Sequence, residues 1–190
     1  CSFIGTATTM QIMAEALGLA LPGSSLLPAT SEALKDVAKN IGEHMKFLVE
    51  KDIKPSDILT KDAFENAIMV HAAISGSTNS LLHLPAIASE FGIDLNADLF
   101  DQMHQNAHYL LDIRPAGKYP AEYFYYAGGV PAVMEAIKEN LNLDVMTVTG
   151  KTLGENLEEL KNNGYYENCQ TFLDKINLKS TDIIRPYDDP

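Results

Sequence analysis

The hydrophobic residues of this chain recur mostly at steps of three and four, which is the spacing of an amphipathic helix. The clearest case runs from Glu32 to Lys51, where an apolar stripe follows one face and the charged residues occupy the other. A second helix follows a capping residue at Thr60 and reaches Ser75, and another apolar segment begins at Leu81. Further helices are predicted over residues 11–21, 99–110, 131–140 and 153–160.

Strand patterns are scarce by comparison. Residues 145–150 are the clearest predicted strand, and residues 182–186 form a possible final strand. The remainder of the tail, residues 162–190, has the composition of a loop. Many helices with few strands are typical of part of a layered α/β domain, so we expect the α/β fold class without a complete sheet.

The stretch from His71 to His83 joins two apolar segments through small polar residues. Gly76 can adopt the positive φ that ends a helix. The side chains of Ser77, Thr78 and Asn79 can accept hydrogen bonds from the N–H groups that begin the next one. A helix start of this kind can bind a carboxylate or a phosphate, although the same residues can also be caps and nothing more.

Two other positions are candidate ligands. Cys1 stands before the first predicted helix, where a thiolate is stabilised and can bind a metal or cluster, although a lone cysteine can also be an inert core thiol. His104 and His108 are four residues apart, a spacing at which two imidazoles can share a metal. No HExxH pattern accompanies them, so the alternative is an exposed pair on a solvated helix face.

The loop over residues 112–120 is rich in Pro and Gly and carries two cations, Arg114 and Lys118. Such a loop can receive an acidic substrate or can be a rigid connector whose charges face water. It is followed by the aromatic segment Tyr123–Tyr126, which is most simply explained as core or interface packing.

Composition narrows the function classes. With 190 residues and 46% hydrophobic content, the chain can bury one sizeable core. The net charge of −12 argues against a nucleic-acid partner, and no apolar run reaches membrane length. Cys1 and Cys169 are expected to be cytosolic thiols or metal ligands, and a cytoplasmic location is expected. Because the chain starts at Cys and ends just after an apolar segment, it is expected to be a piece of a longer protein.

Four blocks, in order, resemble the dihydroxy-acid dehydratase and phosphogluconate dehydratase family. They are residues 1–23 (CSFIGTATTM and EALGLALPG), residues 76–84 (GSTN and LHL), residues 114–119 (RPAGKY) and residues 127–134 (AGGVPAVM). The resemblance implies the helix-rich second half of a three-layer α/β/α N-terminal domain, with a C-terminal barrel-like domain absent from these 190 residues. Details around residues 70–79 and 123–126 look more like the sugar-acid (aldonate) branch.

The resemblance also implies a hydro-lyase that converts a 2,3-dihydroxy carboxylate to a 2-keto acid with an iron–sulfur cluster, commonly [2Fe–2S], and Mg²⁺. Cys1 matches the last cluster cysteine, whereas Cys169 matches no ligand. Ser77, Thr78, Asn79 and Lys118 would line the substrate cleft. The magnesium ligands and the base have no counterpart here, so the 190 residues alone are expected to be inactive, and a homodimer or homotetramer is expected for the whole protein.

Two alternatives to a sugar-acid dehydratase stay open at this point. One is a member of the same family that acts on dihydroxyisovalerate or 6-phosphogluconate. The other is a non-enzymatic module in which the Gly-Ser-Thr-Asn helix start binds an anion.

Overall fold

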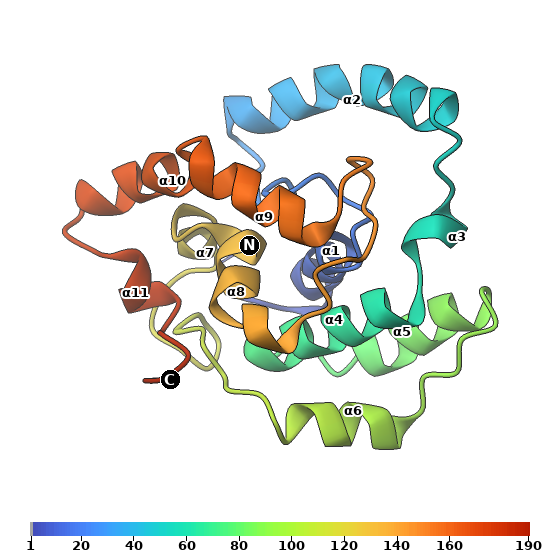
Figure 1. The fold of residues 1–190 in the computed structure, drawn as a ribbon. Coiled ribbons are helices and arrows are strands. Elements are labelled where there is room, and N and C mark those ends of the chain that lie inside the picture. The colour runs from blue at the N-terminus through green and yellow to red at the C-terminus, as the bar shows by residue number, and fades with distance from the viewer. Residues whose placement is uncertain (1) are drawn as a thin grey trace.

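The computed structural model describes residues 2–190 and shows an assembly of helices (Figure 1). Within this part of the chain, β pairing consists of three isolated bridges: Leu111–Ile184, Ile113–Tyr119 and Met146–Thr152. The elements are α1 (Thr6–Ala16), α2 (Glu32–Glu50), α3 (Pro55–Ile58), α4 (Lys61–Ala73), α5 (Ser80–Ser89), α6 (Ala97–His104), α7 (Glu122–Tyr126), α8 (Gly129–Ala136), the 3₁₀ helix η1 (Lys138–Asn140), α9 (Leu153–Asn162), α10 (Tyr165–Asp174) and α11 (Ser180–Ile183).

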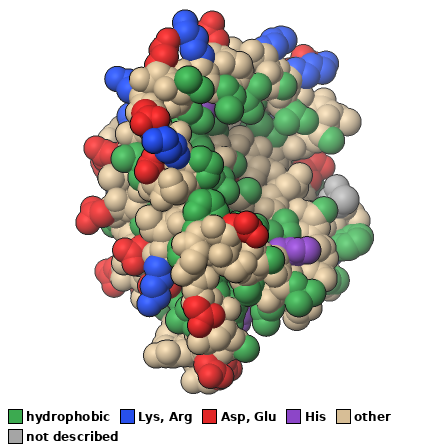
Figure 2. All heavy atoms as spheres, turned by 90° about the vertical axis from the view of Figure 1, so that its right-hand side faces the viewer, with side chains coloured by type: hydrophobic (Ala, Val, Ile, Leu, Met, Phe, Trp, Pro, Cys, Tyr) green, Lys and Arg blue, Asp and Glu red, His purple; other side chains and the backbone are tan. Residues whose placement is uncertain are grey.

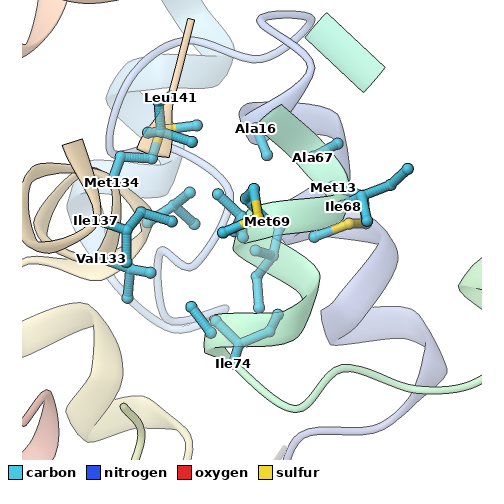
Figure 3. Packing of buried hydrophobic residues seen from close by; sticks show 14 of the residues in the cluster. Met13, Ala16, Ala67, Ile68, Met69, Ile74, Val133, Met134, Ile137 and Leu141 are labelled. Atoms are coloured by element: carbon cyan, nitrogen blue, oxygen red, sulfur yellow. The ribbon is translucent and has the colours of Figure 1, made fainter. Parts of the chain in front are cut away.

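Helix α4 lies at the centre of the fold, because α1, α6 and α8 all pack against it. Figure 3 shows Ile68 of α4 close to Met13 of α1, while Met69 lies between these side chains and Met134 of α8. All four side chains are buried. Burial of this apolar surface stabilises the arrangement of α1, α4 and α8 and so fixes where their ends lie.

Helix α2 is the predicted amphipathic helix, but its apolar stripe is not covered in the described structure. None of its residues is buried, and Val49 is 77% exposed. The helix crosses one end of the molecule, with lysines and acidic residues outermost and hydrophobic side chains below them (Figures 1 and 2). Two side chains contact the body: Nε2 of His44 donates to the Val148 carbonyl oxygen, 2.9 Å away, and the Phe47 ring lies against Gly150.

The predicted strand over residues 145–150 is wrong. These residues form a turn, in which the Gly150 N–H donates to the Thr147 carbonyl and the Thr147 N–H donates to the Lys151 carbonyl. Gly150 has φ of +75°, and the buried Asn156 amide donates to the Thr147 hydroxyl at 2.8 Å. The chain therefore reverses direction instead of extending, although Val145 and Val148 are buried as an apolar run predicts.

Several boundaries also differ from the predicted ones. Helix α1 begins at Thr6 and ends before Gly18, because the Gly18 N–H donates to Glu15 and the Leu19 N–H donates to Ala14, the bond pair of a glycine-stopped helix. The tail is not mostly loop, since α10 packs its Phe172 ring on Tyr126 with centroids 4.0 Å apart. The helix-rich character is confirmed, and membership of a three-layer α/β/α domain remains a prediction.

Candidate functional site

The loop between α4 and α5 begins with a helix end completed by Ser75. The Gly76 N–H donates to the His71 carbonyl at 3.0 Å, and the Ser75 N–H donates to the Ala72 carbonyl at 3.1 Å. Ser75 holds the left-handed conformation, with φ of +49°, so the prediction that Gly76 supplies the positive φ is wrong. Gly76 is needed for another reason: a Cβ there would lie 2.5 Å from Cδ2 of the His71 ring.

Two of the predicted site residues meet the start of α1. The Asn79 amide nitrogen donates to the Thr6 hydroxyl at 2.8 Å and to the Ser77 hydroxyl at 3.0 Å, and the two hydroxyls are 3.2 Å apart. Asn79 therefore does not cap α5 with its side chain, contrary to the capping interpretation. The first turn is closed by backbone bonds, from the Ser80 N–H to the Ser77 carbonyl and from the Leu81 N–H to the Thr78 carbonyl.

These residues present polar groups at the surface. Thr78 and Asn79 are exposed, whereas Ser77 is half-buried and Ser80 is fully buried. The exposed hydroxyl and amide groups can donate to or accept from the oxygen atoms of a polar ligand. The loop thus combines an exposed polar edge with a firmly held base.

The base of the loop is held from behind by two buried side chains. The Ser77 N–H donates to the hydroxyl of Thr9 on α1 at 3.1 Å. On the other side, Nε2 of His71 lies 3.1 Å from the Ser77 carbonyl oxygen. Thr9 is fully buried and His71 is 3% exposed, so both hydrogen bonds are shielded from water.

His71 also meets a second histidine. Its Nδ1 lies 3.2 Å from Nε2 of His104 at the end of α6, and the rings stack with centroids 5.2 Å apart. Burial lowers the pKa of His71 from its ordinary value, and the nearby His104 lowers it further despite the opposing hydrogen bond to Ser77. Burial likewise lowers the pKa of His104, against the opposing charge of Asp101. Both rings are therefore neutral near pH 7.

Lys118 lies on a separate loop. Its backbone N–H donates to Asp112 at 2.9 Å, its carbonyl accepts from Nε of Arg114 at 3.2 Å, and its ammonium group lies 4.9 Å from the centre of the Tyr119 ring. The side chain is exposed, and the contacts it makes within the described residues are to its own loop. The structure therefore does not bring Lys118 into direct contact with Ser77 or Asn79.

The residues before α1 link the two loops. The Ile4 N–H donates to the Arg114 carbonyl at 2.9 Å, and the Ala121 N–H donates to the Ser2 carbonyl at 3.2 Å, while Thr6 a few residues later holds Asn79. A cavity of about 440 Å³ opens beside this segment, between α1, residues 25–30 and the start of α7. Three blocks that are distant in sequence thus meet at the start of α1.

The candidate ligands do not form a metal site in the part of the chain that the structure describes. Cys1 lies outside the described residues, and residues 2–190 hold no group of three or more His, Cys, Asp or Glu side chains placed to bind an ion. Cys169 is a buried free thiol whose pKa is raised by burial, in keeping with a structural role. The described residues therefore do not by themselves provide a ligand set for a cluster or for Mg²⁺.

The structure does not place His104 and His108 where they could share a metal. Helix α6 ends at His104, so the two rings do not share a helix face. His104 is half-buried against His71, whereas Nδ1 of His108 lies 2.9 Å from the carbonyl oxygen of Tyr187. The alternative of an exposed pair holds only for His108.

Thr6, Thr9 and the contact between His71 and His104 were not predicted from the sequence. For His71 a signal was present, because it occupies the apolar face of a helix beside Phe64 and Ala67. A polar group on a buried face needs a hydrogen-bond partner, and the nearest polar backbone is the loop that follows.

Residues 1–156 match the family model for the N-terminal part of dihydroxy-acid/6-phosphogluconate dehydratases. The chain is similar to the dihydroxy-acid dehydratase of Caldicellulosiruptor bescii, with 46% identity over 100% of the chain and 32% of that protein. It is 49% identical to the dihydroxy-acid dehydratase of Cytophaga hutchinsonii, over 84% of the chain and 29% of that protein. It is 45% identical to dihydroxy-acid dehydratase 1 of Methanosarcina acetivorans, over 85% of the chain and 29% of that protein. It thus spans about a third of their length, at 32% for the first relative. By this match the chain belongs to the dihydroxy-acid/6-phosphogluconate dehydratase family.

Proposed function

We propose that the chain forms part of a hydro-lyase that removes water from a 2,3-dihydroxy carboxylate, and that residues 76–79 form one wall of its substrate cleft. The observation that carries the proposal is the family match over residues 1–156, which includes all four sequence blocks. The names of the relatives support the dihydroxy-acid alternative better than the sugar-acid prediction. We therefore take a dihydroxy acid of the dihydroxyisovalerate type as the first substrate to test.

The reaction removes a proton from C2 and a hydroxide from C3, and the resulting enol rearranges to a 2-keto acid. Within this chain the exposed Thr78 hydroxyl can donate to a hydroxyl or carboxylate oxygen of the substrate. The Asn79 N–H groups already donate to Thr6 and Ser77, so its side-chain oxygen can accept from a substrate hydroxyl. Their backbone is fixed through Ser77 by two buried side chains, so binding the substrate requires little ordering of the loop. The role we derive for the described residues is binding and orientation.

Charge favours the same assignment. The substrate is an anion, and the chain has a net charge of −12, which repels it. A cation near the cleft would therefore be needed to attract the substrate locally. The exposed Lys118 lies on a loop that is tied to the segment preceding α1. We propose that Lys118 attracts the substrate carboxylate. The iron–sulfur cluster and Mg²⁺ implied by the family resemblance remain a prediction, since Cys1 lies outside the described residues.

The test is 2-keto acid formation by the full-length protein that carries this chain, prepared anaerobically with Mg²⁺. The substrates are 2,3-dihydroxyisovalerate, an aldonate and 6-phosphogluconate. We expect turnover of the first, and a kcat/KM lowered about three- to tenfold in Asn79→Ala, because one lost hydrogen bond between neutral groups contributes about 0.5–1.5 kcal/mol. The 190 residues alone are expected to be inactive.

The matched control is Asn162→Ala, which removes an exposed amide at the end of α9 that bonds Glu158. Its kcat/KM should equal that of the wild type. Turnover of the aldonate alone would refute the choice of substrate. No turnover of any of the three acids by cluster-loaded protein would refute the proposed reaction.

A further inference from the structure

The buried His71–His104 pair stands behind the exposed edge of the loop and takes no part in the binding role assigned above. His71 comes from the last turn of α4, and His104 is the last residue of α6. The His71 ring is not placed to touch a ligand at the Thr78–Asn79 edge, because it is almost fully buried and its two ring nitrogens already have partners. The question is what the pair does for the loop.

The hydrogen-bond pattern determines which ring atoms carry protons. The Ser77 carbonyl oxygen can only accept, so Nε2 of His71 must carry its proton. In the neutral ring Nδ1 is then bare and accepts from Nε2–H of His104. The Ser77 carbonyl therefore selects the Nε2–H tautomer of His71, and His104 completes the arrangement by donating to the bare Nδ1.

The ring also determines the path of the backbone. It fills the space where a side chain at position 76 would begin, so Gly76 and Ser77 lie directly against it. The Ser77 carbonyl accepts from both His71 and the Ser80 N–H, which links the ring to the first turn of α5. Phe100 of α6 is buried and meets the His104 ring edge-on, with centroids 6.2 Å apart, so the pair itself is held in place.

On the basis of the proposed function, we propose that His71 is a positioning residue for the dehydration. In its neutral Nε2–H form, with Nδ1 accepting from His104, it holds the Ser77 carbonyl and so fixes the geometry with which Thr78 and Asn79 meet the substrate. Protonation of His71 would place an N–H on Nδ1 opposite the N–H of His104, and the two donors would separate. The ionisable neighbours that act on the pair are each other and Asp101 of α6.

The test compares His71→Gln with His71→Leu in the full-length holoenzyme. A glutamine amide can still donate to the Ser77 carbonyl, whereas leucine cannot. We expect kcat/KM to fall at least tenfold in His71→Leu and less than about threefold in His71→Gln, with KM carrying most of the change because the loop binds substrate. The control is His44→Gln, which alters a half-buried histidine that also contacts a backbone carbonyl, at Val148, and should have no effect.

Two readouts separate positioning from simple loss of packing. The wild type should lose activity on the acid side as the pair becomes protonated, and His71→Gln should lose this dependence. Imidazole ¹⁵N NMR of the histidine-labelled holoenzyme, with the His71→Gln spectrum used for assignment, should show His71 protonated at Nε2 and bare at Nδ1. His104→Ala should leave the proton on Nε2, because the Ser77 carbonyl can still only accept.

Equal losses in His71→Gln and His71→Leu, or an unchanged acid limb in His71→Gln, would overturn the proposal. A His71 proton on Nδ1 would do so independently of any turnover. If the wild type turns over none of the acids, the proposed reaction fails, while the ¹⁵N spectra still decide whether His71 donates from Nε2 to the loop.

Discussion

Replacing Gly76 with alanine is the sharpest test of how the loop is held. The added Cβ would lie 2.5 Å from Cδ2 and 2.9 Å from Nε2 of His71, and 3.0 Å from Cγ2 of Thr9. Carbon atoms in favourable contact are about 3.5–4.0 Å apart, so the overlap with the ring is about 1 Å. Gly76 does not have a positive φ, so the substitution tests this contact and not the backbone conformation.

The ring has no free direction in which to move. His71 is 3% exposed and both of its ring nitrogens are hydrogen-bonded. Overpacking a buried site costs about 1–3 kcal/mol, and leaving a buried hydrogen-bonding group without a partner costs about 1–3 kcal/mol. Against this, replacing a glycine gains about 0.4–1 kcal/mol by restricting the unfolded chain. We expect a net destabilisation of about 2–4 kcal/mol.

The measurement is the thermal unfolding midpoint of the full-length protein, where each kcal/mol corresponds to about 2–4 °C for a domain of this size. Gly76→Ala should lower the midpoint of the transition that includes this domain by at least about 4 °C. Gly42→Ala is the matched control: it lies within α2 with no atom within 4 Å of its added Cβ, and should stabilise by about 0.5–1 kcal/mol.

A double-mutant cycle with His71→Ala isolates the clash. If the ring is the obstacle, Gly76→Ala should cost about 1 kcal/mol or less once His71 is alanine, because the overlapping atoms are gone. An unchanged cost in that background would refute the reasoning, and so would a wild-type midpoint in Gly76→Ala itself.

Two further predictions concern buried polar groups away from the loop. Burial raises the pKa of Glu15 from 4.5, against hydrogen bonds from Ser25 and Gly23, so its contribution to stability is fully present below pH 4.5 and is lost as pH rises through the raised folded pKa. Glu15→Gln should therefore become more stable relative to the wild type as pH rises toward neutrality; a pH-independent difference in unfolding midpoint would contradict this. Asn66, 1% exposed, donates to the Asn142 carbonyl at 2.9 Å and accepts from its N–H at 2.7 Å. Asn66→Ala should lower the free energy of unfolding in urea by about 2–4 kcal/mol, because the N–H and carbonyl of Asn142 lose their partner. The exposed Asn162→Ala should lower it by less than about 0.5 kcal/mol. An equally small loss in Asn66→Ala would show that water replaces the Asn66 side chain.

Periodicity predicted where the helices lie better than where they end. The centres of α2, α4 and α9 follow from apolar spacing, and the predicted cap at Thr60 is confirmed, since its side chain accepts from the Ala63 N–H. Helix α1 was placed five residues late, because the small residues before Gln11 carry little apolar signal and the stop at Gly18 was not recognised. Spacing identifies faces, but ends depend on single backbone bonds.

The false strand at residues 145–150 has a different origin. An apolar run with Thr and Val fits a strand and a buried turn equally well, and the difference is made by the Asn156 side chain, which bonds Thr147 from the next helix. Helix α10 is also absent from the predicted elements, although Tyr165, Cys169 and Phe172 recur at helical steps of four and three. It is stabilised by aromatic contacts between Phe172 and α7, which a single-segment pattern does not contain.

The structure has a loop at residues 76–79 as predicted, whereas the role of these residues in substrate binding stays a prediction. Ser77 and Asn79 do lie together, yet their partners are Thr6 and Thr9, which are 68 to 73 residues away in the chain. Lys118 is on a loop that touches the same segment without touching Ser77. The spacing of residues within one segment does not predict contacts between segments this far apart. The family resemblance was what associated the four sequence blocks with one site.

This dependence on distant partners has a consequence for how the site can fail. The Ser77 backbone is held by Thr9 of α1 and by His71 of α4, which in turn contacts α6. The apolar core fixes the positions of α1 and α4. A change in packing between Met13 and Ile68 would therefore shift the hydrogen-bond partners of Ser77. It would do so although both residues are buried in the core and not part of the exposed edge. If the loop is held by packing, such core substitutions should lower the proposed activity more than their effect on stability explains. If the loop is held by its own residues, they should not.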